Sequence, residues 1–73
     1  MKTLSKEILE KLRAEFQPDT RVKLICMDDP YVDMKPGELG TVRNVDDMGT
    51  VHIAWDNGHG LGAVYGKDVI EKL

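Results

Sequence analysis

The sequence has few of the side chains on which catalysis usually depends. It contains one cysteine, Cys26, one serine, Ser5, and two histidines, His52 and His59. A single cysteine cannot form an internal disulfide, which fits a reducing compartment. Nucleophilic catalysis needs a nucleophile, a base and an orienting group close together. No such set can be assembled from this sequence, so we expect no catalytic residue and no enzymatic activity.

The sequence also lacks a recognisable metal or cofactor motif. Zinc sites use three or four ligands at characteristic spacing, usually with paired cysteines or histidines, and here the histidines are isolated. Residues 58–63 read GHGLGA and match one form of the dinucleotide fingerprint. That motif must open a helix in a βαβ unit, whereas here it leads into a predicted strand. We therefore expect no metal and no cofactor.

Long apolar runs and an excess of positive charge are absent as well. No stretch approaches the length of a membrane span, and the first residues lack the apolar segment of a signal peptide. We therefore expect a cytoplasmic protein without membrane contact. The net charge of −3 gives no general attraction to phosphate backbones.

Residues 40–58 contain the strongest structural signals in the sequence. From residue 51 to residue 55 apolar side chains alternate with polar or small ones, which is typical of a strand with one buried face. Gly49 and Asn57-Gly58 are hairpin turn signals. The pattern predicts three consecutive antiparallel strands.

Trp55 is the largest side chain of this region, and we expect it to be at least partly buried. Gly40 is expected to lie beneath it on the preceding strand, where the backbones approach closely. A two-residue turn at Asn57-Gly58 would place Trp55 opposite Gly60 on the next strand.

One further strand precedes this region, and the first strand of the region, over residues 38–45, has an irregular pattern. Residues 21–27 alternate so that Val22, Leu24 and Cys26 share one face, and we expect Cys26 in the core as a small apolar residue. In residues 38–45, Val42 and Val45 lie three apart, so a regular strand cannot bury both. Either a β-bulge near Arg43-Asn44 re-aims the chain or Val45 lies at the rim, and the spacing favours the bulge because strongly bent strands close small barrels.

A short helix is predicted at the N-terminal end of the chain, over residues 4–16. Ser5 is expected to cap it, and Pro18 ends the segment. An apolar stripe recurs at helical spacing and consists of Ile8, Leu9, Leu12 and Phe16. This stripe should pack on the sheet, and part of it could meet a second copy of the chain, giving a homo-oligomer.

Together these elements predict one mainly β domain over residues 1–73. A proline-rich and aspartate-rich loop spans residues 28–37, and a last short strand is predicted at 69–73. The expected fold is a small SH3-like five-stranded antiparallel barrel, at about residues 19–73, with one short N-terminal α-helix.

Six separated blocks of the sequence carry a family pattern: PDTRVKL (18–24), MDDPY (27–31), KPGELGTV (35–42), VDDMGTVH (45–52), WDNG (55–58) and LG (61–62). In order and spacing they resemble the small bacterial and mobile-element proteins grouped as domain of unknown function 4314. The resemblance runs from about Ser5 to the C-terminus, with Asp19 standing where the pattern has glycine. It implies an SH3-like barrel and a prokaryotic or phage-related setting, and it implies no activity.

Two surfaces are candidate binding sites. The first is acidic and aromatic, suits a basic or proline-containing protein segment, and consists of Asp28, Asp29, Tyr31, Asp46, Asp47 and Tyr65. Against this reading, aspartate is common in turns for structural reasons. The leading hypothesis is therefore a non-enzymatic module that binds a protein or peptide.

The second surface is the outer face of the sheet, the usual nucleic-acid platform of a small barrel. Its basic residues are Arg21, Lys23, Arg43 and His52. Residues 36–42 also resemble the KOW-type barrel motif, whose domains bind RNA or protein. A nucleic-acid-binding barrel is thus the alternative function.

Overall fold

The structure is a computed structural model that describes residues 5–28 and 34–73. Helix α1 (Lys6–Glu15) begins after Ser5, whose hydroxyl accepts a hydrogen bond from the N–H of Ile8 at 3.2 Å. The predicted helix and its cap are thus confirmed.

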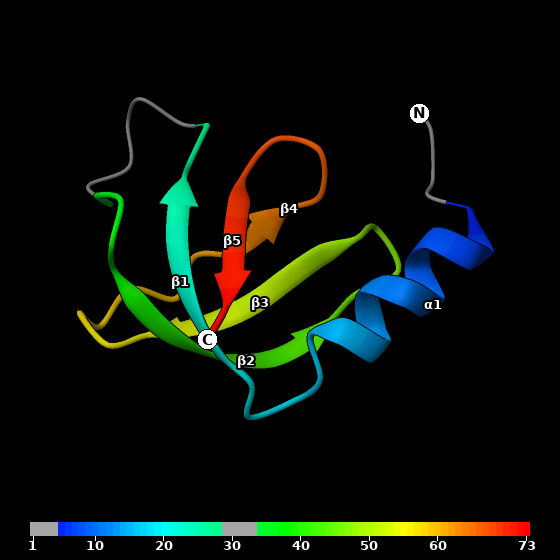
Figure 1. Ribbon diagram of the computed structural model, residues 1–73, viewed down its shortest axis with the longest axis horizontal. Coiled ribbons are helices and arrows are strands. Elements are labelled where there is room, and N and C mark those ends of the chain that lie inside the picture. The colour runs from blue at the N-terminus through cyan, green and yellow to red at the C-terminus, as the bar shows by residue number, and fades with distance from the viewer. Residues whose placement is uncertain (1–4, 29–33) are drawn as a thin grey trace.

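Figure 1 shows α1 beside one end of a curved sheet. In the described part of the chain, no helix has the length and apolar character needed to cross a membrane.

Five strands form one antiparallel sheet in the spatial order β4-β3-β2-β1-β5. Their bounds are β1 (Arg21–Cys26), β2 (Leu39–Val45), β3 (Thr50–Trp55), β4 (Ala63–Val64) and β5 (Val69–Lys72). The predicted mainly β class with one short helix is confirmed.

The sheet does not close into the predicted barrel. It ends at β4 and β5, and within the described residues no strand ladder joins these two edges. The physical reason is the shortness of β4, which pairs with β3 only at Thr50 and Val51. The preceding glycine-rich stretch, residues 58–62, runs outside the strands. Too little of β4 remains extended to reach β5.

The predicted bulge in β2 is present. Val42 pairs with Ile53 and Asn44 pairs with His52, so Arg43 is the extra residue. The bulge re-aims the chain, and both Val42 and Val45 are buried. One strand therefore supplies core side chains that a regular alternation would send to opposite faces.

Gly40 pairs with Trp55 as expected, and the indole is buried at 3% exposure. A Cβ atom at position 40 would lie 2.6 Å from Ile53 Cγ2 and 2.8 Å from Trp55 Cε3. The predicted register of the next hairpin is wrong by one residue. The N–H of Trp55 donates to the carbonyl of His59 at 3.0 Å, so Trp55 faces His59 instead of Gly60. The loop between them has three residues, 56–58, and Gly58 takes a positive φ of 94°.

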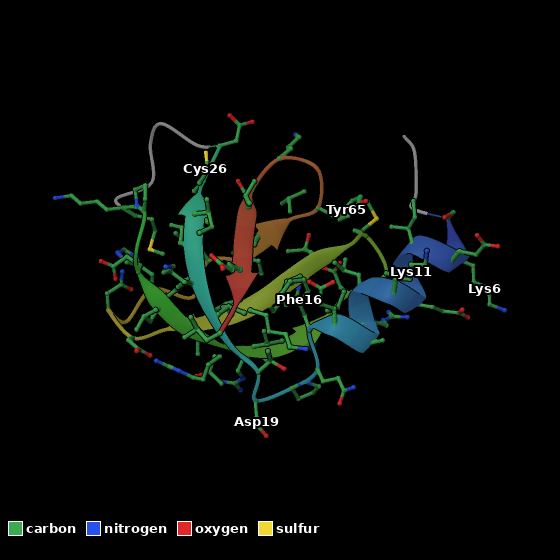
Figure 2. All side chains as sticks on the ribbon, in the orientation of Figure 1. Lys6, Lys11, Phe16, Asp19, Cys26 and Tyr65 are labelled. Carbon is green, nitrogen blue, oxygen red and sulfur yellow. The ribbon has the colours of Figure 1, made fainter. Side chains whose placement is uncertain are left out.

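Cys26 was expected in the core, and this prediction is wrong because the residue is exposed. The β1–β5 pairing shifts register between Leu24 and Cys26. Ile25 is the extra residue there, so the alternation that buries Val22 and Leu24 ends before Cys26. Figure 2 shows Cys26 at the far end of β1.

The core lies between the inner face of the sheet and α1. It consists of Leu12, Phe16, Val22, Leu24, Val42, Val45, Val51, Ile53, Trp55 and Ala63. The turn from the helix into β1 passes through Asp19, which takes a positive φ of 74°. Glycine adopts this conformation without steric cost, and aspartate is among the residues that tolerate it. This conformation is compatible with the glycine that the sequence resemblance leads us to expect at this position.

The close packing over Gly40 gives a test of the fold. We expect Gly40→Ala to lower the free energy of unfolding by about 1 to 3 kcal/mol, because the added methyl overpacks the contact with Ile53 and Trp55. The matched control is Gly60→Ala, where a Cβ atom would meet nothing within 4 Å. Urea unfolding followed by Trp55 fluorescence measures both. Equal stability of the two variants would contradict the packing described.

Candidate functional site

The described structure contains an apolar cleft of about 330 Å³. It lies between α1, the β3–β4 pair and β5. Its lining residues are Leu12, Glu15, Phe16, Val51, Ala63, Val64, Tyr65, Gly66, Asp68, Val69 and Ile70. The volume is at the lower end of the range for ligand pockets, about 300 to 1,000 Å³. It suits a bulky side chain or two better than a large cofactor.

The floor and the mouth of the cleft differ in exposure. Leu12, Phe16, Val51 and Ala63 form a buried apolar floor. At the mouth, Tyr65 is 49% exposed and Val69 is 50% exposed. An apolar group entering the cleft would therefore bury these two side chains together with its own surface.

Asp68 holds the turn that forms one wall of the cleft. Its Oδ2 accepts the N–H of Val64 at 2.8 Å, and its Oδ1 accepts the N–H of Asp28 at 2.7 Å. The backbone N–H groups of Lys67 and Asp68 both donate to the carbonyl of Val64. Hydrogen bonds thus stabilise the β4–β5 turn internally and also join it to Asp28, which follows β1.

Two smaller hollows adjoin the cleft, and we call the three together the furrow. One is lined by Ile8, Lys11, Leu12, Glu15 and Tyr65. The other is lined by Ala14, Glu15, Gln17, Pro18, Asp19, Thr20 and Lys72. Glu15 borders all three hollows, so the furrow follows α1 and the turn that leads into β1. Tyr65 and Lys11, both labelled in Figure 2, line the first of these smaller hollows.

The predicted acidic and aromatic set is only partly described. Asp29 and Tyr31 lie outside the described residues. Asp28 is exposed at the end of β1 and is linked to the β4–β5 turn through its N–H. Tyr65 begins that same turn, and its N–H donates to the carbonyl of Gly49 at 3.2 Å. The structure therefore connects Asp28 and Tyr65 with one turn.

Asp46 and Asp47 lie in the β2–β3 turn, and both have partners within the molecule. Asp46 Oδ1 accepts the N–H groups of Met48 and Thr50, and Oδ2 lies 2.8 Å from His52 Nε2. Hydrogen bonds from His52 and then from Thr50 lower the pKa of Asp46 below its ordinary value. Asp47 forms an ion pair with Arg13 of α1 at 2.6 Å. These two carboxylates stabilise the turn and attach it to the helix.

The predicted basic set lies on the outer face of the sheet. Arg21 forms a two-point ion pair with Asp56, at 2.9 Å and 2.7 Å, and Nη1 also donates to Thr41. The hydrogen bonds from Arg21 lower the pKa of Asp56. His52 bonds Asp46, whereas Arg43 is exposed at the bulge and Lys23 is half-buried. Two of the four basic side chains thus face a carboxylate.

Among residues 5–28 and 34–73, no group of three histidine, cysteine, aspartate or glutamate side chains is placed to hold a metal ion. His52 is hydrogen-bonded to Asp46, and His59 lies in the exposed loop after Gly58.

Sequence reasoning missed Glu15 and Asp68 as parts of a site. Helical periodicity identified the apolar stripe of α1 but gave no sign that Glu15 borders a hollow. Asp68 follows a turn signal at Gly66-Lys67, and only the three-dimensional pairing shows that its carboxylate joins two distant backbone segments.

The pKa of Asp46 predicts the pH dependence of stability. A carboxylate with a lowered folded-state pKa stabilises the fold above its unfolded-state pKa, and this contribution is lost as the pH falls through the folded-state pKa. We expect Asp46→Asn to be less stable than the wild type by a few tenths to about 1 kcal/mol at neutral pH, because the exposed pair with His52 is screened by solvent. The difference should narrow as the pH falls below the ordinary aspartate pKa of about 4.

Urea titrations at a series of pH values measure this difference. Asp47→Asn is the matched control, because it removes a charge from the same turn without removing an acceptor of the turn's N–H groups. A constant gap between Asp46→Asn and the wild type over the acid range would contradict the assignment.

The comparisons with known proteins give a family but no activity. No match is found among curated proteins or among solved structures. The sequence profile described as Domain of unknown function (DUF4314) matches residues 5–73, which is nearly the whole chain. The resemblance seen in the sequence blocks is thereby confirmed, and the chain belongs to the DUF4314 family.

Proposed function

We propose that the protein is a non-enzymatic interaction module that binds a segment of another protein. The observation that carries the proposal is the apolar cleft with half-exposed Tyr65 and Val69 at its mouth. Apolar surface of this kind, arranged as a concavity with polar groups at its rim, is typical of binding sites.

The proposal includes the SH3-like assignment of the fold. Supporting it are the five antiparallel strands and the pairing of β1 with both β2 and β5. The acidic set also belongs to the proposal: Asp28 and Tyr65 adjoin the β4–β5 turn, and the rest of the surface is Asp29, Tyr31, Asp46 and Asp47. A bacterial or mobile-element setting and a cytoplasmic location stay predictions, as does self-association through α1.

The alternative is a nucleic-acid-binding barrel using Arg21, Lys23, Arg43 and His52. Charge argues against it. Arg21 is paired with Asp56, His52 is bonded to Asp46, and the whole chain carries a net charge of −3. Binding to phosphate backbones depends on cations that are free to replace counterions.

We expect the immobilised protein to retain a partner from a bacterial lysate after nuclease treatment, and Tyr65→Ala to reduce that capture by about tenfold or more, as hot-spot aromatics do. Arg43→Glu should leave it unchanged. Met48→Ala is the matched control, because Met48 is similarly exposed, at 46%, but does not line the cleft. Quantitative mass spectrometry of the eluates is the measurement.

The opposite pattern would overturn the proposal. Capture that disappears with nuclease and with Arg43→Glu, and that survives Tyr65→Ala, would establish the nucleic-acid reading. Its affinity for a mixed-sequence oligonucleotide should then fall steeply with added salt.

A further inference from the structure

Strand β5 has an open edge that faces away from β1. The N–H of Leu73 donates to the carbonyl of Arg21 at 3.0 Å, and Lys23 pairs with Glu71. In an antiparallel pair, successive residues direct their N–H and C=O groups alternately toward and away from the partner strand. The backbone groups of Ile70 and Lys72 therefore point to the free edge, since β5 is the last strand of the sheet.

The furrow runs along this free edge. Ile70 lines the apolar cleft, and Lys72 lines the adjoining hollow at the end of α1. Glu15 borders both hollows from the opposite wall. Phe16 and Tyr65, both labelled in Figure 2, line the apolar cleft together with Ile70. Unpaired strand groups thus lie next to a hollow that accepts apolar side chains.

The charged side chains that line the cleft itself are acidic, whereas the two adjoining hollows also include Lys11 and Lys72. The cleft's only charged lining residues in the described structure are Glu15 and Asp68. Both oxygens of Asp68 already accept backbone N–H groups. Within the described parts of the chain, the carboxylate of Glu15 has no hydrogen-bond or ion-pair partner, so it is the acidic group available to a bound cation.

We propose that the furrow binds an extended segment of another protein, which adds to the edge of β5 as a sixth strand. A large apolar side chain of this segment enters the cleft, and a lysine or arginine lies against Glu15. Because alternate side chains of a strand share a face, the apolar and basic residues should lie two apart in the bound sequence. This inference rests on the proposed binding function and names its ligand.

The observations favour a cationic segment over a second copy of this chain. Two copies paired through β5 about a two-fold axis would bring the same two acidic side chains of the cleft, Glu15 and Asp68, into both halves of one interface. Like charges across an interface disfavour association. Lysine on an edge strand also discourages pairing between identical edges, and Lys72 is placed at this edge.

The test uses a phage-displayed library of random peptides of about 12 residues, selected on the immobilised full chain. The enriched peptides should share a large apolar residue and a basic residue two positions apart. Fluorescence anisotropy of the best synthetic peptide then gives its Kd. We expect about a tenfold or greater weakening for Glu15→Lys, from loss and reversal of the charge pair. Glu10→Lys is the matched control, with the same charge change on an exposed position of α1 that lines none of the hollows.

A second variant tests the strand pairing. Lys72→Pro removes an N–H that points to the free edge, and proline is tolerated at such positions. It should weaken binding by at least about tenfold while the thermal unfolding midpoint remains close to that of the wild type. If this variant is unstable, the same peptide with alternate amides N-methylated tests the pairing from the ligand side. Amide chemical shifts of Ile70 and Lys72 in the wild type should move on titration.

Three results would overturn the inference. One is the absence of any enriched peptide, and another is equal affinity of selected peptides for Glu15→Lys and Glu10→Lys. The third is a dimer in sedimentation velocity that Lys72→Pro abolishes, which would make a second copy the occupant. Peptides that bind but shift only the amides of Asp28 and of the 46–49 turn would remove the furrow as the site and leave the proposed binding function intact.

Discussion

The packing of Trp55 over Gly40 is the contact on which the sheet depends. The missing side chain at position 40 lets the indole lie directly on β2, and the Nε1–H of Trp55 donates to the carbonyl of Leu61 at 2.8 Å. One side chain therefore fixes the closest point of the β2–β3 pair and also holds the glycine-rich segment that follows it. A small domain has few such contacts, so each contributes a large share of its marginal stability.

The bulge at Arg43 is the second constraint, and it follows from the spacing of Val42 and Val45. The bulge could be predicted from the sequence because a regular strand, with its period of two, cannot bury two residues that lie three positions apart. The helix was readable for the same kind of reason, since its cap and its apolar stripe are local features. Cys26 was misjudged because the register shift in the β1–β5 pair depends on a strand about 45 residues away along the chain. Local alternation contains no information about such a shift.

The candidate site is less predictable than the fold, and the reason is again long-range. Tyr65 and Asp28 were predicted as members of the acidic and aromatic surface, and the structure links both to the β4–β5 turn. Their connection runs through Asp68, which reads as an ordinary turn residue in the sequence. Glu15 reads as one more charge on a solvated helix face. The role we propose for it comes from its position at the hollows that Ile70 and Lys72 also line, which only the path of the whole chain determines.

An open sheet edge next to an apolar hollow is a hazard for a protein unless something limits what can bind there. Edge strands invite indiscriminate pairing, and proteins oppose this with short strands and charged side chains. Here β5 has four residues, Val69–Lys72, and two of them are charged. Glu15 and Asp68 add a second source of specificity. Their carboxylates repel another copy of this acidic chain and attract a cationic segment. The feature that prevents barrel closure, a β4 of only two residues, is therefore also what leaves β5 accessible, and the charges around that edge determine which chemistry can use it.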